Sequence, residues 1–209
     1  MGETPLHRKN LGETLDELED WFAGDPMVYV SGNMMMYYVE GDKRKHVSPD
    51  VFVTKGIAKN TPRKYYLVWQ EGKSPDAIIE FTSNSTKGED QVSKLKLYEK
   101  TLKVQEYFLF DPYYEYLTSP LMGYRLVKGI YRPIKPVAGR LPSEVFGLHL
   151  EAEGQKLRLY DPKQKRWLPT RMERIQQAEA EKEKAEAENA KLRAQLAALM
   201  QQRGNGSKS

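Results

Sequence analysis

Three charged residues, two acidic and one basic, lie where their charge needs a partner. Glu80 stands inside the apolar run Ala77–Phe81, which predicts a buried strand, and a buried carboxylate is costly unless it is paired. Asp50 stands at the entrance of another apolar run, "VFV", which predicts a second strand. Lys94 follows in a segment of helical character. Together they predict a charged site at the end of a β-sheet.

The chemistry of such a site is that of a bound metal ion. Two carboxylates brought together by neighbouring strands repel each other unless a cation lies between them. Mg²⁺, with Mn²⁺ as a substitute, takes one or two carboxylates and completes its shell with water and phosphate. The ion would bind the phosphate and lower the pKa of water, and a lysine would neutralise developing charge. Asp50, Glu80 and Lys94 therefore suit the attack of water on a phosphodiester.

The segment from Asp90 to Val104, "DQVSKLKLYEKTLKV", predicts the helix that presents Lys94. At about 100° per residue, four side chains form its inward stripe; these are Gln91, Leu95, Tyr98 and Leu102. Lys94 lies only about 60° from the centre of this stripe. The other lysines, Lys96, Lys100 and Lys103, point to solvent by the same arithmetic. Lys94 is therefore the helix lysine that we expect to reach the sheet.

Each of the three residues also has a purely structural interpretation. Asp50 follows Ser-Pro and could be a turn residue. Glu80 could pair with a structural arginine or lysine, and Lys94 could extend its aliphatic stem along apolar surface. The functional interpretation is favoured because all three are unusually placed in the same way.

The elements that must position these residues alternate between helix and strand. Residues 13–22, "ETLDELEDWF", predict an amphipathic helix with Thr14 as a cap. A hairpin around "EGDK", strands at "RKYYLVWQ" and "PDAIIEFT", the helix with Lys94 and a strand at "QEYFLFDP" follow. Antiparallel strands from "YYEYLTS" onward, with a helical turn at "PSEVFGL", complete the domain. This order predicts an α/β core with a mixed sheet.

From Arg171 the composition changes to that of one long helix, rich in Ala, Glu, Lys, Leu and Gln. We therefore expect a domain at residues 1–170, a C-terminal helix at 171–203 and a disordered tail at 204–209. With Ile175 as heptad position a, one seam consists of Ile175, Ala178, Lys182, Ala185, Asn189, Leu192, Leu196 and Leu199. Such a seam predicts a homodimeric coiled coil. Its first half is poor in large apolar residues, so a solvated single helix is the alternative.

The composition of the chain limits the partners and the kinds of site that it can have. The net charge is +4 and the pI is about 9.0, which permits a polyanionic partner. The absence of cysteine excludes disulfides, cysteine-ligated zinc and thiol nucleophiles. The histidines His7, His46 and His149 lack ligand spacing and are expected on the surface or in turns.

No segment resembles a signal peptide or a membrane span, so a soluble cytoplasmic protein is expected. "GKS" at residues 72–74 lacks the first glycine of a phosphate-binding loop.

At these residues the sequence resembles a known family. "SPDVFV", "PDAIIEFTSNSTKGED", the "K…LYEK" helix with "LKVQEYFLFDP", and "SEVFGLHL" are similar to the bacterial Uma endonucleases, the second family of that name. That family belongs to the PD-(D/E)XK restriction-endonuclease-like superfamily. The resemblance covers about Pro26 to Leu168. It implies an αβββαβ core and Mg²⁺-dependent hydrolysis of DNA.

The resemblance also implies roles for individual residues. Asp50 matches the aspartate of the first motif, and Glu80 matches the acidic residue of the second. Thr82 stands where the signature has lysine, and the family's displaced lysine points to Lys94. Ser83 and Asp90 would belong to the outer part of the site.

Three functions from different classes follow from these features. The leading hypothesis is a Mg²⁺-dependent DNA endonuclease with Asp50, Glu80 and Lys94 at its site. The alternative is a catalytically inactive nuclease-like module that binds DNA or protein. In a third interpretation, the C-terminal helix makes the chain chiefly an interaction protein. The intact set of two carboxylates and a lysine favours the first.

Overall fold

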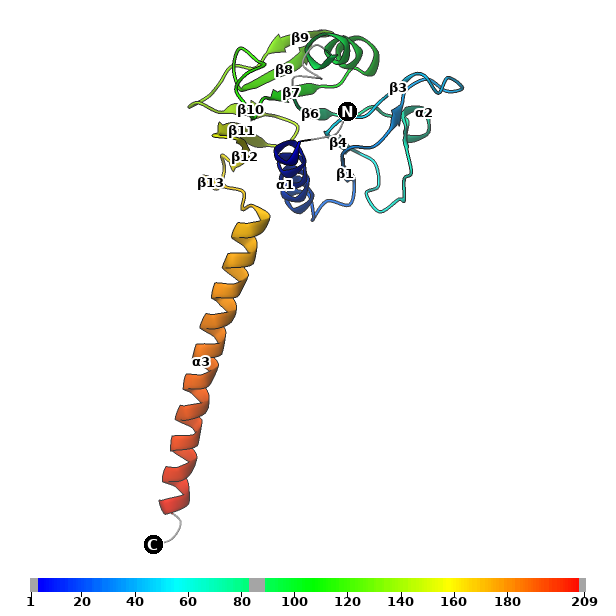
Figure 1. The fold of residues 1–209 in the computed structure, drawn as a ribbon. Coiled ribbons are helices and arrows are strands. Elements are labelled where there is room, and N and C mark those ends of the chain that lie inside the picture. Colours follow the sequence, from blue (N-terminus) through cyan, green and yellow to red (C-terminus); the bar gives the residue numbers. More distant parts are fainter. Residues whose placement is uncertain (1–3, 83–88, 207–209) are drawn as a thin grey trace. The chain divides into compact units, whose positions relative to one another are not determined.

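A six-stranded sheet, drawn from blue to green in Figure 1, forms the centre of the fold and has the order β1-β4-β6-β7-β8-β9. The computed structural model describes residues 4–82 and 89–206. The strands of this sheet are β1 (Val28–Ser31), β4 (Val51–Lys55), β6 (Ala77–Phe81), β7 (Glu106–Phe110), β8 (Leu121–Val127) and β9 (Ile130–Pro133). β6 and β7 are parallel, and the other neighbours are antiparallel. The predicted mixed α/β sheet is confirmed.

Two smaller sheets accompany the central one. The first contains β10 (Leu141–Ser143), β11 (Leu148–Glu153), β12 (Lys156–Asp161) and β13 (Arg166–Trp167). The second has the order β3-β2-β5, with β2 at Met36–Tyr37, β3 at His46–Val47 and β5 at Tyr66–Leu67. β2 and β3 are antiparallel across the "EGDK" turn, which confirms the predicted hairpin.

The central sheet has an apolar core on each face because side chains alternate along its strands. From β6, Ile79 and Phe81 pack in the cluster that includes α1 (Pro5–Trp21) and β10–β12. Ile78 points to the other face, into a cluster with Tyr98 and Leu102. Glu80 shares the face of Ile78, as the alternation predicts. Figure 1 shows α1 beside β11 and β12.

The first helix begins earlier than expected. It starts at Pro5, and Thr4 Oγ1 accepts a hydrogen bond from His7 N at 3.2 Å. Thr14 is buried within the helix, so its assignment as a cap was wrong. A capping threonine followed by proline is a strong helix start, whereas Gly12 within the helix costs only about 1 kcal/mol relative to alanine.

Some of the predicted strands form turns instead. "RKYYLVWQ" contains only the two-residue β5, followed by the one-turn helix α2 (Val68–Glu71), whose C-cap is Gly72 with φ of 69°. "YYEYLTS" forms turns because Asp111 accepts hydrogen bonds from the backbone N–H groups of Tyr113, Tyr116 and Leu117. "PSEVFGL" contains the end of β10 and a turn to β11, without a helical element.

The helix that presents Lys94 is π-helical in two parts, η1 (Glu89–Lys94) and η2 (Leu97–Leu102). Single π-helical turns are uncommon and occur often at functional sites. The orientation of the helix nevertheless agrees with the prediction. Tyr98 and Leu102 are buried, while Lys96, Lys100 and Lys103 are exposed.

A buried carboxylate joins the central sheet to the sheet β10–β13. Glu106 begins β7 and accepts hydrogen bonds from Ser143 Oγ at 2.5 Å and Val145 N at 3.2 Å. Arg125 Nε on β8 donates to the same carboxylate at 2.9 Å. The negative charge of Glu106 is thereby compensated, and the two sheets are fixed to each other.

The long helix α3 (Arg171–Gly206) belongs to a separate compact unit, Pro169–Ser209. Thr170 and Glu173 form a reciprocal cap, in which Thr170 N donates to Glu173 Oε2 at 2.7 Å and Glu173 N to Thr170 Oγ1 at 3.3 Å. Within residues 4–82 and 89–206, no helix is both long and apolar enough to cross a membrane.

Candidate active site

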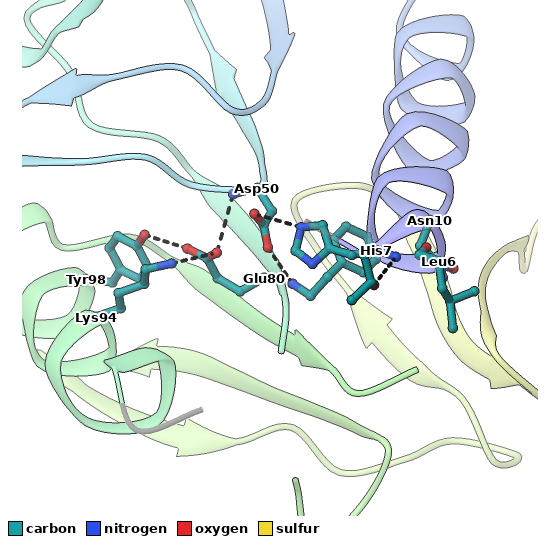
Figure 2. A network of polar contacts seen from close by, with 9 residues as sticks. Leu6, His7, Asn10, Asp50, Glu80, Lys94 and Tyr98 are labelled. Atoms are coloured by element: carbon teal, nitrogen blue, oxygen red, sulfur yellow. Dashed lines mark hydrogen bonds and ion pairs between the residues drawn. The ribbon is translucent and has the colours of Figure 1, made fainter. Parts of the chain in front are cut away.

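Asp50 and Glu80 meet because β4 and β6 are antiparallel. Val51 is opposite Ile79, so the preceding residue, Asp50, is brought next to Glu80. Phe81 N donates a hydrogen bond to Asp50 Oδ2 at 2.7 Å, and Asp50 N approaches Glu80 Oε2 at 3.4 Å. Figure 2 shows the two carboxylates side by side at the end of the strands. The backbone of each strand thus fixes the acidic residue of the other.

The charge of Glu80 is compensated from the helix that covers this face of the sheet. Glu80 is fully buried. Lys94 Nζ lies 2.9 Å from Glu80 Oε2, and Tyr98 Oη donates a hydrogen bond to Glu80 Oε1 at 2.8 Å. The structure therefore brings Lys94 to the carboxylates, as its position on the helix predicts. Tyr98 was expected in the inward stripe, but its contact with Glu80 was not foreseen.

A histidine completes the row of polar groups in Figure 2. His7 Nε2, from the first turn of α1, lies 3.4 Å from Asp50 Oδ1. Only 13% of its side chain is exposed, and its ring packs edge-on against Phe81 at 5.8 Å between centroids. The expectation that His7 is a surface or turn histidine was wrong. The place of His7 in the sequence does not predict its contact with Asp50, because a single histidine without the spacing of metal ligands does not indicate a functional site.

The turn of α1 that bears His7 is anchored to a distant part of the fold. Asn10 Nδ2 donates to the carbonyl of Gln155 at 2.9 Å, and Leu157 N donates to Asn10 Oδ1 at 3.1 Å. These bonds join α1 to the β11–β12 turn. His7 is consequently held on a fixed helix rather than on a loop.

The backbone next to Asp50 leaves no room for a side chain on the neighbouring segment. A Cβ atom at Gly32 would lie 2.1 Å from the carbonyl oxygen of Asp50. Because the obstacle is backbone, any substitution of Gly32 would displace Asp50 or the chain after β1. Glycine at this position therefore lets the entrance of β4 sit close to β1.

The structure describes only some of the other residues that the family signature implies. Thr82, where the signature has lysine, is buried, and its backbone N–H donates to the carbonyl of Phe110 at 2.8 Å. Ser83 lies outside the described residues. Asp90 lies in η1, and its side chain is likewise outside the described part.

The donor set fits a hard divalent cation. Asp50 and Glu80 supply two adjacent carboxylates, the number that Mg²⁺ commonly takes from a protein that also offers it phosphate. Among the residues that the structure describes, no group of three or more histidine, aspartate or glutamate side chains could enclose a metal ion. Two carboxylates leave positions in the shell of such an ion for water and phosphate.

Two comparisons with known proteins found a match. The family model Uma2, described as "Putative restriction endonuclease", matches residues 1–197. A solved structure entitled a "putative nuclease belonging to DUF820" from Anabaena variabilis is similar, with 16% identity and a TM-score of 0.47. The match covers 72% of this chain and 80% of that one. No curated protein sequence matches this chain.

Proposed function

Because the chain belongs to the Uma2 family, we propose that it is an endonuclease that hydrolyses phosphodiester bonds of DNA with a divalent metal ion. The observation that carries this proposal is the meeting of Asp50, Glu80 and Lys94 at one end of the central sheet. Acidic pairs that receive a lysine in this way are suited to phosphate chemistry.

Asp50 and Glu80 would hold the ion, which is Mg²⁺ or Mn²⁺. When bound, the ion supplies neutralisation of phosphate charge and a lowered pKa for water. The backbone bond from Phe81 N fixes Asp50, and the Tyr98 hydroxyl fixes Glu80. These contacts position the two carboxylates before any ligand arrives, so less reorganisation is needed on binding.

Lys94 would act on the charge that develops during the reaction. Its ammonium group lies 2.9 Å from Glu80 Oε2, and its side chain is 12% exposed. A cation held at this place can donate a hydrogen bond to a phosphate oxygen and stabilise negative charge in the transition state. Thr82 is buried and neutral, so it does not offer this cation.

Nicking of supercoiled plasmid DNA tests the proposal. The protein should cleave with Mg²⁺ or Mn²⁺, and EDTA should stop cleavage. Asp50→Ala and Glu80→Gln should lose cleavage but remain folded by circular dichroism, although Glu80→Gln removes the negative charge that faces the Lys94 ammonium group and should lower the melting temperature. Asp25→Asn, at an exposed carboxylate, is the matched control and should cleave normally. DNA binding without cleavage by the unchanged protein would instead favour an inactive binding module.

A further inference from the structure

A pocket of about 330 Å³ lies on the small sheet β3-β2-β5 and its flanking segments. Its wall is mainly apolar and contains three aromatic rings. The residues that matter here are Tyr37, Val39, Tyr65, Leu67, Trp69 and Lys43. None of them takes part in the carboxylate site.

The aromatic wall follows from the pairing of β2 with β5. These strands are parallel, with Met36 opposite Tyr66 and Tyr37 opposite Leu67. Met36 and Tyr66 are fully buried and face the core, so alternation turns Tyr37 and Leu67 outward. The rings of Tyr37 and Tyr65 are 5.8 Å apart and nearly perpendicular. Tyr65 is 52% exposed, so its ring is accessible.

The one-turn helix that brings Trp69 to the pocket is held by a strong ion pair. Arg63 Nε lies 2.7 Å from Glu71 Oε1, and Arg63 Nη2 lies 2.8 Å from Glu71 Oε2. The guanidinium group also lies over the ring of Tyr29, 4.3 Å from its centroid. Such a two-point contact fixes α2 more firmly than its four residues could alone. The pocket wall is therefore formed before a ligand binds.

The surroundings of the pocket are basic. Lys43 lines the pocket, and three further exposed cations, Arg44, Lys45 and Lys64, are next to lining residues or close to them along the chain. The carboxylates there are Glu40 and Asp42, of which Asp42 lines the pocket. Asp42 is further neutralised by Arg44, whose Nε and Nη2 lie 3.0 Å and 3.1 Å from its oxygens. The lysines therefore remain available for phosphate groups of a ligand.

The pocket is close to the carboxylate site along the chain. Tyr37 of the pocket is opposite His46 in the pairing of β2 with β3, and Asp50 follows His46 by four residues. At about 3.3–3.6 Å per residue, the chain from His46 to Asp50 spans at most roughly 14 Å. A nucleic-acid strand that contacts the hairpin β2–β3 is consequently within reach of Asp50 and Glu80.

We propose that this pocket binds an unpaired nucleobase of the nucleic acid that the carboxylate site cleaves. The inference rests on the proposed nuclease function and adds the substrate class, namely single-stranded or locally unpaired DNA. Bases stack on tyrosine and tryptophan rings regardless of their sequence, and neighbouring lysines bind the phosphates. A paired base is covered on both faces by its neighbours, so it enters such a pocket only when it is turned out of the duplex.

Binding of an oligonucleotide under conditions that prevent cleavage tests the base pocket separately from catalysis. In EDTA, fluorescence anisotropy compares a short single-stranded oligonucleotide with one of equal length and charge whose central bases are replaced by abasic sites. The unchanged protein should bind the complete oligonucleotide at least about 5- to 150-fold more tightly, the range for loss of the stacking of one base. Tyr65→Ala and Trp69→Ala should remove this difference. Tyr65→Ala is the safer variant because half of its side chain is already exposed.

Two controls separate stacking from charge. Tyr114→Ala alters a ring that is 49% exposed but lies outside the pocket, and it should preserve the preference for bases. Lys64→Ala should weaken the binding of both oligonucleotides alike.

The outcomes distinguish the two proposals. Plasmid cleavage together with equal affinity for the two oligonucleotides would overturn the base pocket and leave the nuclease in place. A preference for bases that disappears in Tyr65→Ala supports the pocket even if no cleavage is observed. A preference that survives both Tyr65→Ala and Trp69→Ala would place base recognition elsewhere and contradict the inference.

Discussion

His7 Nε2 lies 3.4 Å from Asp50 Oδ1, although the two residues come from a helix and from the entrance of a strand. Both side chains are shielded, with 13% and 14% exposed. Asp50 is thus held from two sides, by His7 at one oxygen and by the N–H of Phe81 at the other. We therefore expect His7 to be a positioning residue, which would act on a bound ion through Asp50.

We expect His7→Ala to weaken Mn²⁺ binding by about 10- to 100-fold, the usual loss when the partner of a metal ligand is removed. Isothermal titration calorimetry measures this affinity directly. His7→Gln, which retains a hydrogen-bond donor, should lose less. His149→Ala is the control, since His149 lies in β11 beside Tyr160. Equal Mn²⁺ affinities for His7→Ala and the unchanged protein would refute the positioning role.

Lys94→Ala should reduce the cleavage rate by about 10²–10³-fold, the loss typical of one electrostatic donor at a reacting centre. Lys96→Ala, at an exposed position on the same helix, should cleave almost normally. Similar losses in both variants would indicate a general effect of charge.

Lys94→Ala should also change stability in a metal-dependent way. Without its ammonium group, the buried Glu80 carboxylate faces Asp50, and unfolding should become easier by up to about 3 kcal/mol. Added Mg²⁺ should restore the melting temperature of Lys94→Ala more than it raises that of the unchanged protein, because the ion replaces the lost positive charge. A melting temperature of Lys94→Ala that does not respond to Mg²⁺ would contradict metal binding at these carboxylates.

Tyr98→Phe removes the hydroxyl group that donates to Glu80 Oε1. A hydrogen bond to a charged acceptor contributes about 1.5–3 kcal/mol, so urea denaturation should show a loss of this size. Tyr131→Phe is a matched control in the same cluster, because the hydroxyl of Tyr131 donates to the carbonyl of Val104 at 3.0 Å. Only Tyr98→Phe should also weaken Mn²⁺ binding. Equal Mn²⁺ affinities of the two variants would separate Tyr98 from the site.

For the C-terminal helix, we predict that α3 of two chains pairs in a homodimer. Ile175, Leu192 and Leu196 of the predicted seam are 43%, 55% and 57% exposed in the single chain. Light scattering should give a dimer for the full chain and a monomer for a chain that ends at Thr170. The double variant Leu192→Glu, Leu196→Glu should be monomeric, whereas Ala187→Glu, on the opposite side of the heptad, should not. A full-length monomer at micromolar concentration would exclude the coiled coil.

Much of the arrangement around Glu80 follows from two periodicities. Alternation along β6 predicts that Glu80 faces away from Ile79, and the helical repeat predicts that Lys94, but not Lys96, reaches the sheet. Both agree with the structure. The catalytic and metal-binding roles of Asp50, Glu80 and Lys94 remain proposals that the experiments above test.

Contacts between segments that are far apart in the sequence were not predicted. His7 reaches Asp50 only because Asn10 ties α1 to the β11–β12 turn, a tertiary contact without a local sequence signal. The strand predicted at "RKYYLVWQ" ends early because Arg63 and Glu71 stabilise a helical turn. The preference of its aromatic residues for a strand stabilises that conformation less than this ion pair stabilises the helical turn.

The compensation of Glu106 has a consequence for how the chain folds during synthesis. Val145, which donates to this carboxylate, is 39 residues further along. At about 5–20 residues per second, roughly 2–8 s pass before the ribosome has added it. Arg125 is made sooner and can neutralise Glu106 in the interval. We therefore expect the nascent chain to hold β7 in an incompletely packed sheet until β10 emerges, and a chain interrupted before Leu141 to be a substrate for chaperones.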